Sequence, residues 1–212
     1  MTFYFQTALR MTKAVFLGAL LFPVLAFSTH AAPVIGQLAP DFSAMDITGK
    51  PFKLLDHRGK IVVLEWTNHE CPFVQKHYGT GNMQKTQKEA VNQGVVWVSI
   101  VSSAPGRQGH TDTVQAQKIV TESGAVPTAK ILDESGAIGG LYGASTTPDM
   151  FVIDEKGLLV YSGAIDDNSS PNPATVEGAK NYVLAALSEL KSGKGVSTPQ
   201  TQPYGCGVKY DY

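Results

Sequence analysis

The chain lacks a strong excess of charge of either sign. Its 212 residues contain 17 Lys and Arg against 18 Asp and Glu, which gives a formal net charge of −1. Removal of the N-terminal segment that carries Arg10 and Lys13, and no acidic residue, would move the net charge from −1 to −3. An acidic chain does not suit the polyanionic backbone of nucleic acids, which argues against nucleic acid as a partner.

The chain also lacks an apolar N-terminal run long enough to span a membrane. The stretch Ala14–Phe27 has 14 residues, whereas a spanning helix needs ~20. Arg10 and Lys13 before it and small residues after it are typical of a secretory signal peptide. We predict that residues 1–31 form a signal peptide cleaved after Ala31, with no stable membrane insertion and a mature domain outside the cytoplasm. A membrane anchor is the alternative.

Cysteine is scarce, since the chain has only Cys71 and Cys206. Cys71 follows an apolar run and a polar turn, and Pro72 follows Cys71. This order places the thiol at the start of a helix, where proline is favoured and unpaired backbone N–H groups favour a thiolate. A cysteine so placed is typical of redox chemistry. In an exported chain a disulfide with Cys206 is chemically permitted.

The pattern of the chain predicts one α/β domain. With 43% hydrophobic residues, 212 residues can bury one sizeable core. Apolar runs alternate with helical segments and end in a hairpin, so we expect parallel βαβ units and an antiparallel end. Strands are expected at 61–66, 95–101 and 128–132, with a hairpin over 150–162 that turns at 155–157. Helices are expected at 72–93, kinked or split at Gly79 and Gly81, at 111–124 with Thr111 as the cap, at 139–140 as a short turn, and at 175–192.

This order of elements, with a cysteine between the first strand and the first helix, resembles the thioredoxin superfamily. Pro40-Asp41-Phe42 and the Thr147-Pro148 step before the hairpin are similar to those of redoxin and peroxiredoxin-like (AhpC/TSA-like) proteins. The resemblance covers about residues 33–192. It implies a thioredoxin-like fold, a central mixed β-sheet flanked by helices, in which a cis peptide bond before Pro148 faces Cys71.

The C-terminal segment carries a second resemblance. Residues 193–212 are rich in Gly, Thr, Pro and Gln and are expected to form an extended tail that carries Cys206. The run 71–78 together with Gly-Cys-Gly-Val-Lys-Tyr near the C-terminus is similar to an exported redoxin subgroup of proteobacterial type. That resemblance implies a periplasmic protein.

One acidic residue stands inside the first predicted strand. Glu65 lies six residues before Cys71, where thioredoxins place a buried carboxylate. Burial without a partner would cost several kcal/mol or raise the pKa of the carboxyl group. Glu65 is therefore expected to be either a proton relay for the thiol or one half of a buried ion pair.

The chain departs from its relatives in two ways that bear on mechanism. Thioredoxins carry a second cysteine three positions after the first, where this chain has Val74, so Cys206 becomes the expected resolving partner. Peroxiredoxins use a threonine where this chain has Asn68. They also use an arginine, but after signal removal only Arg58 and Arg107 remain, and neither has the expected place near the hairpin. These departures weigh against efficient peroxidase activity without excluding a peroxide substrate.

A helix start alone does not explain a thiolate at neutral pH. Lowering the thiol pKa from ~8.5 to 7 takes roughly 2 kcal/mol, while a helix N-terminus typically supplies ~0.3–1. His69, Lys76 and His77 are the candidates to supply the rest. Glu70 would oppose ionisation unless its side chain points to solvent.

The sequence thus predicts an exported thiol-disulfide oxidoreductase, or peroxiredoxin-like antioxidant protein, that needs no cofactor or metal. The expected substrate is a disulfide-containing protein or a small peroxide, and the reductant is an external thiol. The predicted catalytic residues are Cys71, Cys206 and Glu65, and the predicted substrate-binding residues are Asn68, Pro72, Thr147 and Pro148.

The sequence also allows two alternative functions. One is a non-catalytic binding domain in which a Cys71–Cys206 disulfide serves as a static staple. The other is a copper chaperone, for which the candidate ligands are His69, Cys71, His77 and Cys206.

Overall fold

The computed structural model describes residues 1–3 and 32–211. The predicted signal peptide therefore lies, apart from its first three residues, outside the described part. Among the described residues no helix combines the length and the apolar character that crossing a membrane requires.

The centre of the molecule is the predicted mixed sheet. Its five strands follow the order β5-β4-β3-β7-β8, in which β3, β4 and β5 are parallel and β7 and β8 are antiparallel to their neighbours. Their bounds are β3 (Val62–Trp66), β4 (Val96–Val101), β5 (Ala129–Leu132), β7 (Asp149–Ile153) and β8 (Leu159–Gly163). Every residue of β3 and β4 is buried, which explains why these strands read as almost continuous apolar runs.

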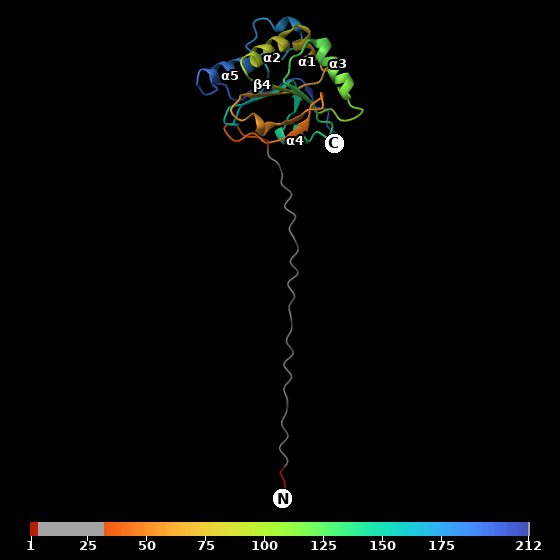
Figure 1. Cartoon of the computed structure of the whole chain (residues 1–212), viewed down its shortest axis with the longest axis vertical. Helices are drawn as coiled ribbons and strands as arrows, with labels where there is room; N and C mark the ends of the chain where they lie inside the picture. The colour runs from red at the N-terminus through yellow and green to blue at the C-terminus, as the bar shows by residue number, and fades with distance from the viewer. Residues whose placement is uncertain (4–31, 212) are drawn as a thin grey trace.

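Helices cover both faces of this sheet. They are α1 (Pro72–Gly79), α2 (Asn82–Asn92), α3 (Thr113–Ser123), α4 (Ala137–Tyr142) and α5 (Tyr182–Lys191), with 3-10 turns at Leu54–His57 and Pro173–Thr175. Helices α1, α2, α3 and α5 lie on one face and α4 lies on the other, as Figure 1 shows. This is the thioredoxin-like arrangement that the sequence predicts.

The first predicted helix is split as expected, and the second helix is capped by a different residue from the one predicted. The segment expected over 72–93 is split, because Gly81 adopts a left-handed conformation with φ of 75° between α1 and α2. The helix expected from Thr111 is capped one residue later. The carboxylate of Asp112 accepts the N–H of Gln115 at 2.8 Å, so Asp112 is the N-cap.

The last predicted helix starts later than expected. The apolar spacing predicts a helix over 175–192, but α5 begins only at Tyr182. Gly178 has a φ of 79°, which interrupts the helical segment, and the side chain of Asn181 caps the new start by accepting the N–H of Leu184 at 2.9 Å. Local turn chemistry therefore overrides a helical spacing that continues across the break.

The core consists of two apolar clusters on opposite faces of the sheet. Side chains alternate along β3, so Leu64 and Trp66 pack in the cluster that includes α4, while Val63 packs in the cluster that includes α2 and α5. The same alternation directs Glu65 toward the α1 and α2 side. The one acidic residue of β3 is thus enclosed between the sheet and two helices.

The C-terminal tail folds back along the domain. Ser162 of β8 exchanges backbone hydrogen bonds with Pro199 and Thr201, each 3.1 Å long. Strand β9 (Cys206–Gly207) then pairs antiparallel with β6 (Thr146–Thr147), outside the main sheet. A second two-stranded sheet, made of β1 (Ser43–Met45) and β2 (Pro51–Lys53), lies near the start of the domain sequence.

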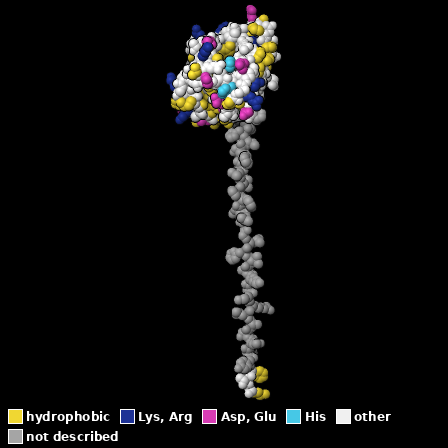
Figure 2. Space-filling view, turned by 90° about the vertical axis from the view of Figure 1, so that its right-hand side faces the viewer, with side chains coloured by type: hydrophobic (Ala, Val, Ile, Leu, Met, Phe, Trp, Pro, Cys, Tyr) yellow, Lys and Arg dark blue, Asp and Glu magenta, His cyan; other side chains and the backbone are white. Residues whose placement is uncertain are grey.

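Charged side chains of both signs share the face of the domain that Figure 2 shows. Lysine and arginine side chains lie between aspartate and glutamate side chains on this face rather than in a block of one sign. This distribution agrees with the small formal net charge of the chain.

Candidate active site

The thiol of Cys71 lies at the start of α1, as predicted. Cys71 is the N-cap residue, with extended backbone angles, and Pro72 occupies the first helical position. The side chain is fully buried, and its thiol donates a hydrogen bond to the carbonyl oxygen of Thr147 at 3.2 Å. The peptide bond between Thr147 and Pro148 is cis. The loop of Thr147 and Pro148 therefore lies against Cys71, as the family resemblance implies.

The tail brings the second cysteine to the same place. In the β6–β9 ladder Cys206 stands directly opposite Thr147. Neither cysteine forms a disulfide in this structure, so the site is in its dithiol state. The backbone passes so close that a Cβ atom on Gly205, whose φ is 138°, would overlap the carbonyl oxygen of Thr147. Only glycine fits this approach.

The pKa values of the two thiols are shifted in opposite directions. Burial raises the pKa of Cys71, but hydrogen bonds from Cys206 and from Thr147 outweigh burial, and the net pKa is lowered. The backbone amide of Val74, in the first turn of α1, contributes in the same direction. Burial and the hydrogen bond to Cys71 raise the pKa of Cys206 to about 11. Cys71 is thus the more acidic thiol of the pair, and Cys206 is the less acidic one.

The side chains of His69, Lys76 and His77, which were expected to help ionise Cys71, are neutral or bound to other groups. Burial lowers the pKa of His69 and lowers that of His77 to about 4, so both rings are neutral at pH 7. Lys76 donates to the carbonyl oxygen of Asn168 at 2.7 Å and lies 3.6 Å from a carboxylate oxygen of Asp166. The expectation that one of these side chains activates the thiol is wrong, because local hydrogen bonds lower its pKa instead.

Asn68 and Glu70 shape the turn that leads to the cysteine. The side-chain oxygen of Asn68 accepts a hydrogen bond from the backbone N–H of Glu70 at 2.9 Å. The side-chain nitrogen of Asn68 donates to the backbone carbonyl oxygen of Gln108 at 3.3 Å. The Glu70 carboxylate accepts the N–H of Gly109 at 2.7 Å. Glu70 is therefore directed to a neighbouring loop, and Asn68 ties the same loop to the turn. The predicted contact of Asn68 with substrate stays a prediction.

Glu65 lies in a buried hydrogen-bond network. Its carboxylate accepts from Tyr78 Oη at 2.7 Å, Trp97 Nε1 at 2.8 Å, Ser99 Oγ at 2.8 Å and Gln87 Nε2 at 3.0 Å. Ser99 stands between Glu65 and Lys130 in the strand register. Burial lowers the pKa of Lys130, and the charge of Glu65 raises it. Within the described residues none of the hydrogen bonds of Glu65 reaches Cys71.

A cavity of about 140 Å³ lies beside this network, between the sheet, α1 and α3. Tyr78 and Ser99, two of the donors to Glu65, line it together with Lys130. Val74 from the first turn of α1 lines it as well. The cavity therefore connects the surroundings of Glu65 with the helix that carries the thiol.

Neither of the two arginines in the described part of the chain contacts the thiol. Arg58 donates to the carbonyl oxygen of Lys156 in the hairpin turn, so, contrary to expectation, it does lie near the hairpin. That turn is at the opposite end of the sheet from Cys71, because Val62 at the start of β3 pairs with Ile153 next to the turn. Arg107 pairs with the exposed carboxylate of Asp211 at 3.4 Å.

The predicted copper ligands do not converge. His77 contacts Tyr204 at 3.1 Å and Asn82 at 2.8 Å. Among residues 1–3 and 32–211, no group of three or more His, Cys, Asp or Glu side chains is placed to hold a metal ion. The copper alternative therefore has no site in the described part of the chain.

A buried thiol of lowered pKa, beside a cis proline and opposite a second thiol on a thioredoxin-like sheet, provides the chemistry that thiol-dependent oxidoreductases use, and the protein is of that class. A model of the AhpC/TSA family matches residues 35–162, and the chain belongs to this family.

Two similar proteins carry names of this class, and a third agrees in fold. Over 140 residues the chain is 26% identical to the thiol-disulfide oxidoreductase ResA of Geobacillus thermodenitrificans, which covers 63% of this chain and 71% of that protein. A solved structure of an uncharacterized conserved protein from Geobacillus kaustophilus is similar with a TM-score of 0.73 and 26% identity, over 84% of this chain and 93% of that one. A provisionally assigned thiol:disulfide interchange protein DsbE from Chlorobium tepidum is similar with a TM-score of 0.51 and 25% identity, over 62% and 85%.

The close approach at Gly205 predicts a specific effect of a single methyl group. In Gly205→Ala the tail can no longer dock on β6, so Cys71 loses its cover and reduced Cys71 should be alkylated by iodoacetamide at least tenfold faster. The matched control is Gly207→Ala, where the nearest atom to the new Cβ is 3.9 Å away and the rate should stay near that of the wild type. Peptide mass spectrometry separates Cys71 from Cys206, and an unchanged rate in Gly205→Ala would contradict the docking.

The buried His77 predicts a dependence of stability on pH. Its pKa is about 4 in the folded protein and 6.5 in the unfolded chain, so between these values the unfolded chain binds the proton that the folded protein does not. The free energy of unfolding therefore falls as pH is lowered through this window, by up to about 3 kcal/mol. Asp149, whose pKa burial raises to about 6, acts in the opposite direction below pH 6.

A comparison of the wild type with His77→Gln separates the contribution of His77 to the pH dependence of stability from that of Asp149. Urea unfolding at pH 7 and pH 4.5 should show a loss of stability on acidification that is smaller in the variant by roughly 2–3 kcal/mol. Equal losses in the two proteins would show that His77 is not buried in its neutral form.

Proposed function

We propose that the protein is an exported thiol-disulfide oxidoreductase in which Cys71 attacks the substrate and Cys206 resolves the intermediate. The observation that carries this proposal is that two neighbouring thiols have pKa values shifted in opposite directions. The pKa of Cys71 is lowered, and that of Cys206 is raised to about 11. An attacking thiol must be ionised, and a waiting thiol must not compete with it.

The reaction with a disulfide substrate then has two exchange steps. The Cys71 thiolate attacks one substrate sulfur, the substrate S–S bond breaks, and one substrate thiol leaves after taking up a proton. Cys206 loses its proton and attacks the Cys71 sulfur of the mixed disulfide, which releases the second substrate thiol. The substrate has been reduced to two thiols, and the protein now holds a Cys71–Cys206 disulfide that an external thiol must reduce.

A small peroxide would use the same pair. The Cys71 thiolate would attack a peroxide oxygen and the O–O bond would break. The other oxygen would leave as an alcohol or water after taking up a proton, and Cys71 would become a sulfenic acid. Cys206 would then form the disulfide and release water. Neither Arg58 nor Arg107 lies where it could hold the peroxide, so the protein-disulfide substrate is the better supported of the two.

We propose that Glu65 moves protons for these steps. Its hydrogen-bond donors Tyr78 and Ser99 line the cavity beside the first turn of α1, which supports a polar path toward Cys71. Burial and the charge of Glu65 raise the pKa of Tyr78, so its hydroxyl group remains a donor at neutral pH.

The substrate backbone would bind at the loop of Thr147 and Pro148, next to Pro72. The backbone of β6 presents an edge that the tail strand β9 occupies in this structure. A substrate segment would pair with the same edge once the tail has moved away, in the manner of an added β-strand.

The export of the protein is part of the proposal. The charged and apolar pattern of residues 1–31 supports a signal peptide, followed by a redoxin domain at 33–192 and a cysteine-bearing tail at 193–212. An oxidising compartment such as the periplasm suits a cysteine pair that cycles between dithiol and disulfide.

Two serine variants test the assignment of roles. Cys71→Ser should lose at least a thousandfold of the rate of insulin disulfide reduction, because the attacking thiolate is gone, while circular dichroism shows an intact fold. Cys206→Ser should keep the first attack and accumulate a mixed disulfide between Cys71 and the substrate, detectable by non-reducing electrophoresis and mass spectrometry.

The same assays separate the alternatives. Full activity in Cys71→Ser would contradict the proposed catalytic role of Cys71. An inactive wild type whose stability drops when the disulfide is reduced would instead support the static staple.

A further inference from the structure

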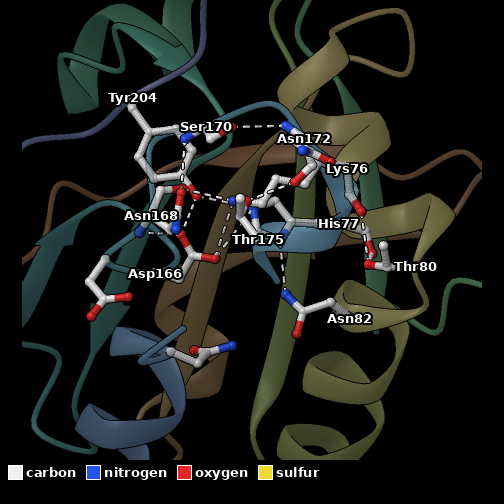
Figure 3. A network of polar contacts seen from close by, with 12 residues as sticks. Lys76, His77, Thr80, Asn82, Asp166, Asn168, Ser170, Asn172, Thr175 and Tyr204 are labelled. Carbon is white, nitrogen blue, oxygen red and sulfur yellow. Dashed lines mark hydrogen bonds and ion pairs between the residues drawn. The ribbon is translucent and has the colours of Figure 1, made fainter. Parts of the chain in front are cut away.

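The tail is anchored to α1 by a tyrosine close to the resolving cysteine. Tyr204 lies two residues before Cys206, and its ring enters a socket that we define as Phe73, Lys76, His77 and Asp166. Its ring centroid lies 5.9 Å from that of Phe73 and 5.5 Å from the ammonium nitrogen of Lys76. Figure 3 shows Tyr204 directed toward Lys76, His77 and Asp166.

The hydroxyl group of Tyr204 is held from two sides. It donates to Oδ1 of Asp166 and contacts Nε2 of His77 at 3.1 Å. The side-chain amide of Asn82 donates to Nδ1 of His77 at 2.8 Å, so in the neutral ring the proton is on Nε2 and points at Tyr204. The chain of donors therefore runs from Asn82 through His77 and Tyr204 to Asp166.

The charges in the socket balance within it. Lys76 is fully buried, donates to the carbonyl oxygen of Asn168 at 2.7 Å and lies 3.6 Å from Oδ2 of Asp166. Oδ2 of Asp166 accepts no hydrogen bond from the described residues, and the ammonium group of Lys76 is a charged group beside it. Burying such a pair has a large desolvation penalty, which the attraction between the two charges offsets. Oδ1 of the same carboxylate is the acceptor of the Tyr204 hydroxyl group.

The socket and the attacking cysteine share one helix. Phe73, Lys76 and His77 are spaced three and four residues apart, so their side chains lie on one side of α1. Cys71 caps the N-terminus of the same helix. A residue that docks in this socket is therefore fixed relative to the attacking thiol.

We propose that Tyr204 is the positioning residue for the resolving cysteine. Docking of Tyr204 fixes the tail two residues before Cys206, and the pairing of Cys206 with Thr147 fixes the tail at the thiol itself. This inference rests on the proposed function, since it assigns a role within the resolution step. The ordered tail gives Cys206 a high effective concentration at Cys71, because chain freedom is lost before the disulfide forms.

The test measures disulfide formation against glutathione in the full-length protein. Tyr204→Phe keeps the ring contacts but removes both hydroxyl hydrogen bonds. We expect the equilibrium constant for the Cys71–Cys206 disulfide in glutathione buffers to fall at least tenfold. We also expect the Cys71–glutathione mixed disulfide to persist at least tenfold longer, since resolution by Cys206 is slower. Acid quenching, alkylation and mass spectrometry give both values.

The matched control removes a hydroxyl group outside the socket. In Tyr182→Phe the ring still stacks on Tyr161, with centroids 6.3 Å apart in the wild type, and both values should stay within twofold. Should Tyr204→Phe fail to fold, His77→Leu removes the donor to the same hydroxyl group, and the equilibrium constant should fall at least threefold.

The outcomes separate the inference from the proposed function. A wild type that forms the disulfide, with a socket variant of unchanged constant and lifetime, overturns the positioning role and leaves the proposed function intact. A wild type that forms no Cys71–Cys206 disulfide at all overturns the proposed function and the inference with it.

Discussion

The pairing of two residues of the tail with two residues beside the cis proline is the contact on which the site depends. This pairing puts Cys206 opposite Thr147 and covers Cys71 completely. It also creates the difference in acidity, because the thiol of Cys206 donates to the sulfur of Cys71 and lowers the pKa of Cys71. This short ladder thus accounts for the opposite pKa shifts of the two thiols and for the burial of Cys71, on which the proposed roles of the two cysteines depend.

Two buried polar networks frame this ladder, and they serve different parts of the molecule. The Glu65 network ties β3 to β4, α1 and α2 through neutral donors, and Lys130 is its charged neighbour. The Asp166 network ties the segment after β8 to α1 and the tail, with Lys76 as the balancing charge. Buried charges are retained only where they are paired or fully hydrogen-bonded, which both networks achieve.

Much of the fold could be predicted from the sequence because its signals are local. Buried strands read as apolar runs, Gly81 splits the first helix, and Cys71-Pro72 marks a helix start. The cis bond at Pro148 followed from family resemblance. The start of α5 was missed because helical spacing continues through Gly178 into a turn.

The socket could not be predicted, because its parts come from three distant segments. Lys76 and His77 lie five and six residues after Cys71 in the sequence, which favoured an electrostatic role, but their partners Asp166 and Tyr204 are set by tertiary packing. The only sequence signal was the joint presence of the motif that follows Cys71 and the motif around Cys206. The structure explains this joint presence, since Tyr204 binds side chains of the first motif.

The reduction potential of the Cys71–Cys206 couple tests the central claim most directly. It is obtained by equilibrating the protein in dithiothreitol and glutathione buffers, trapping the thiols and counting the modified cysteines by mass spectrometry. A catalytic couple predicts a potential more oxidising than about −300 mV. A potential below about −300 mV, where structural disulfides lie, or the absence of any disulfide between the two cysteines, would contradict the account.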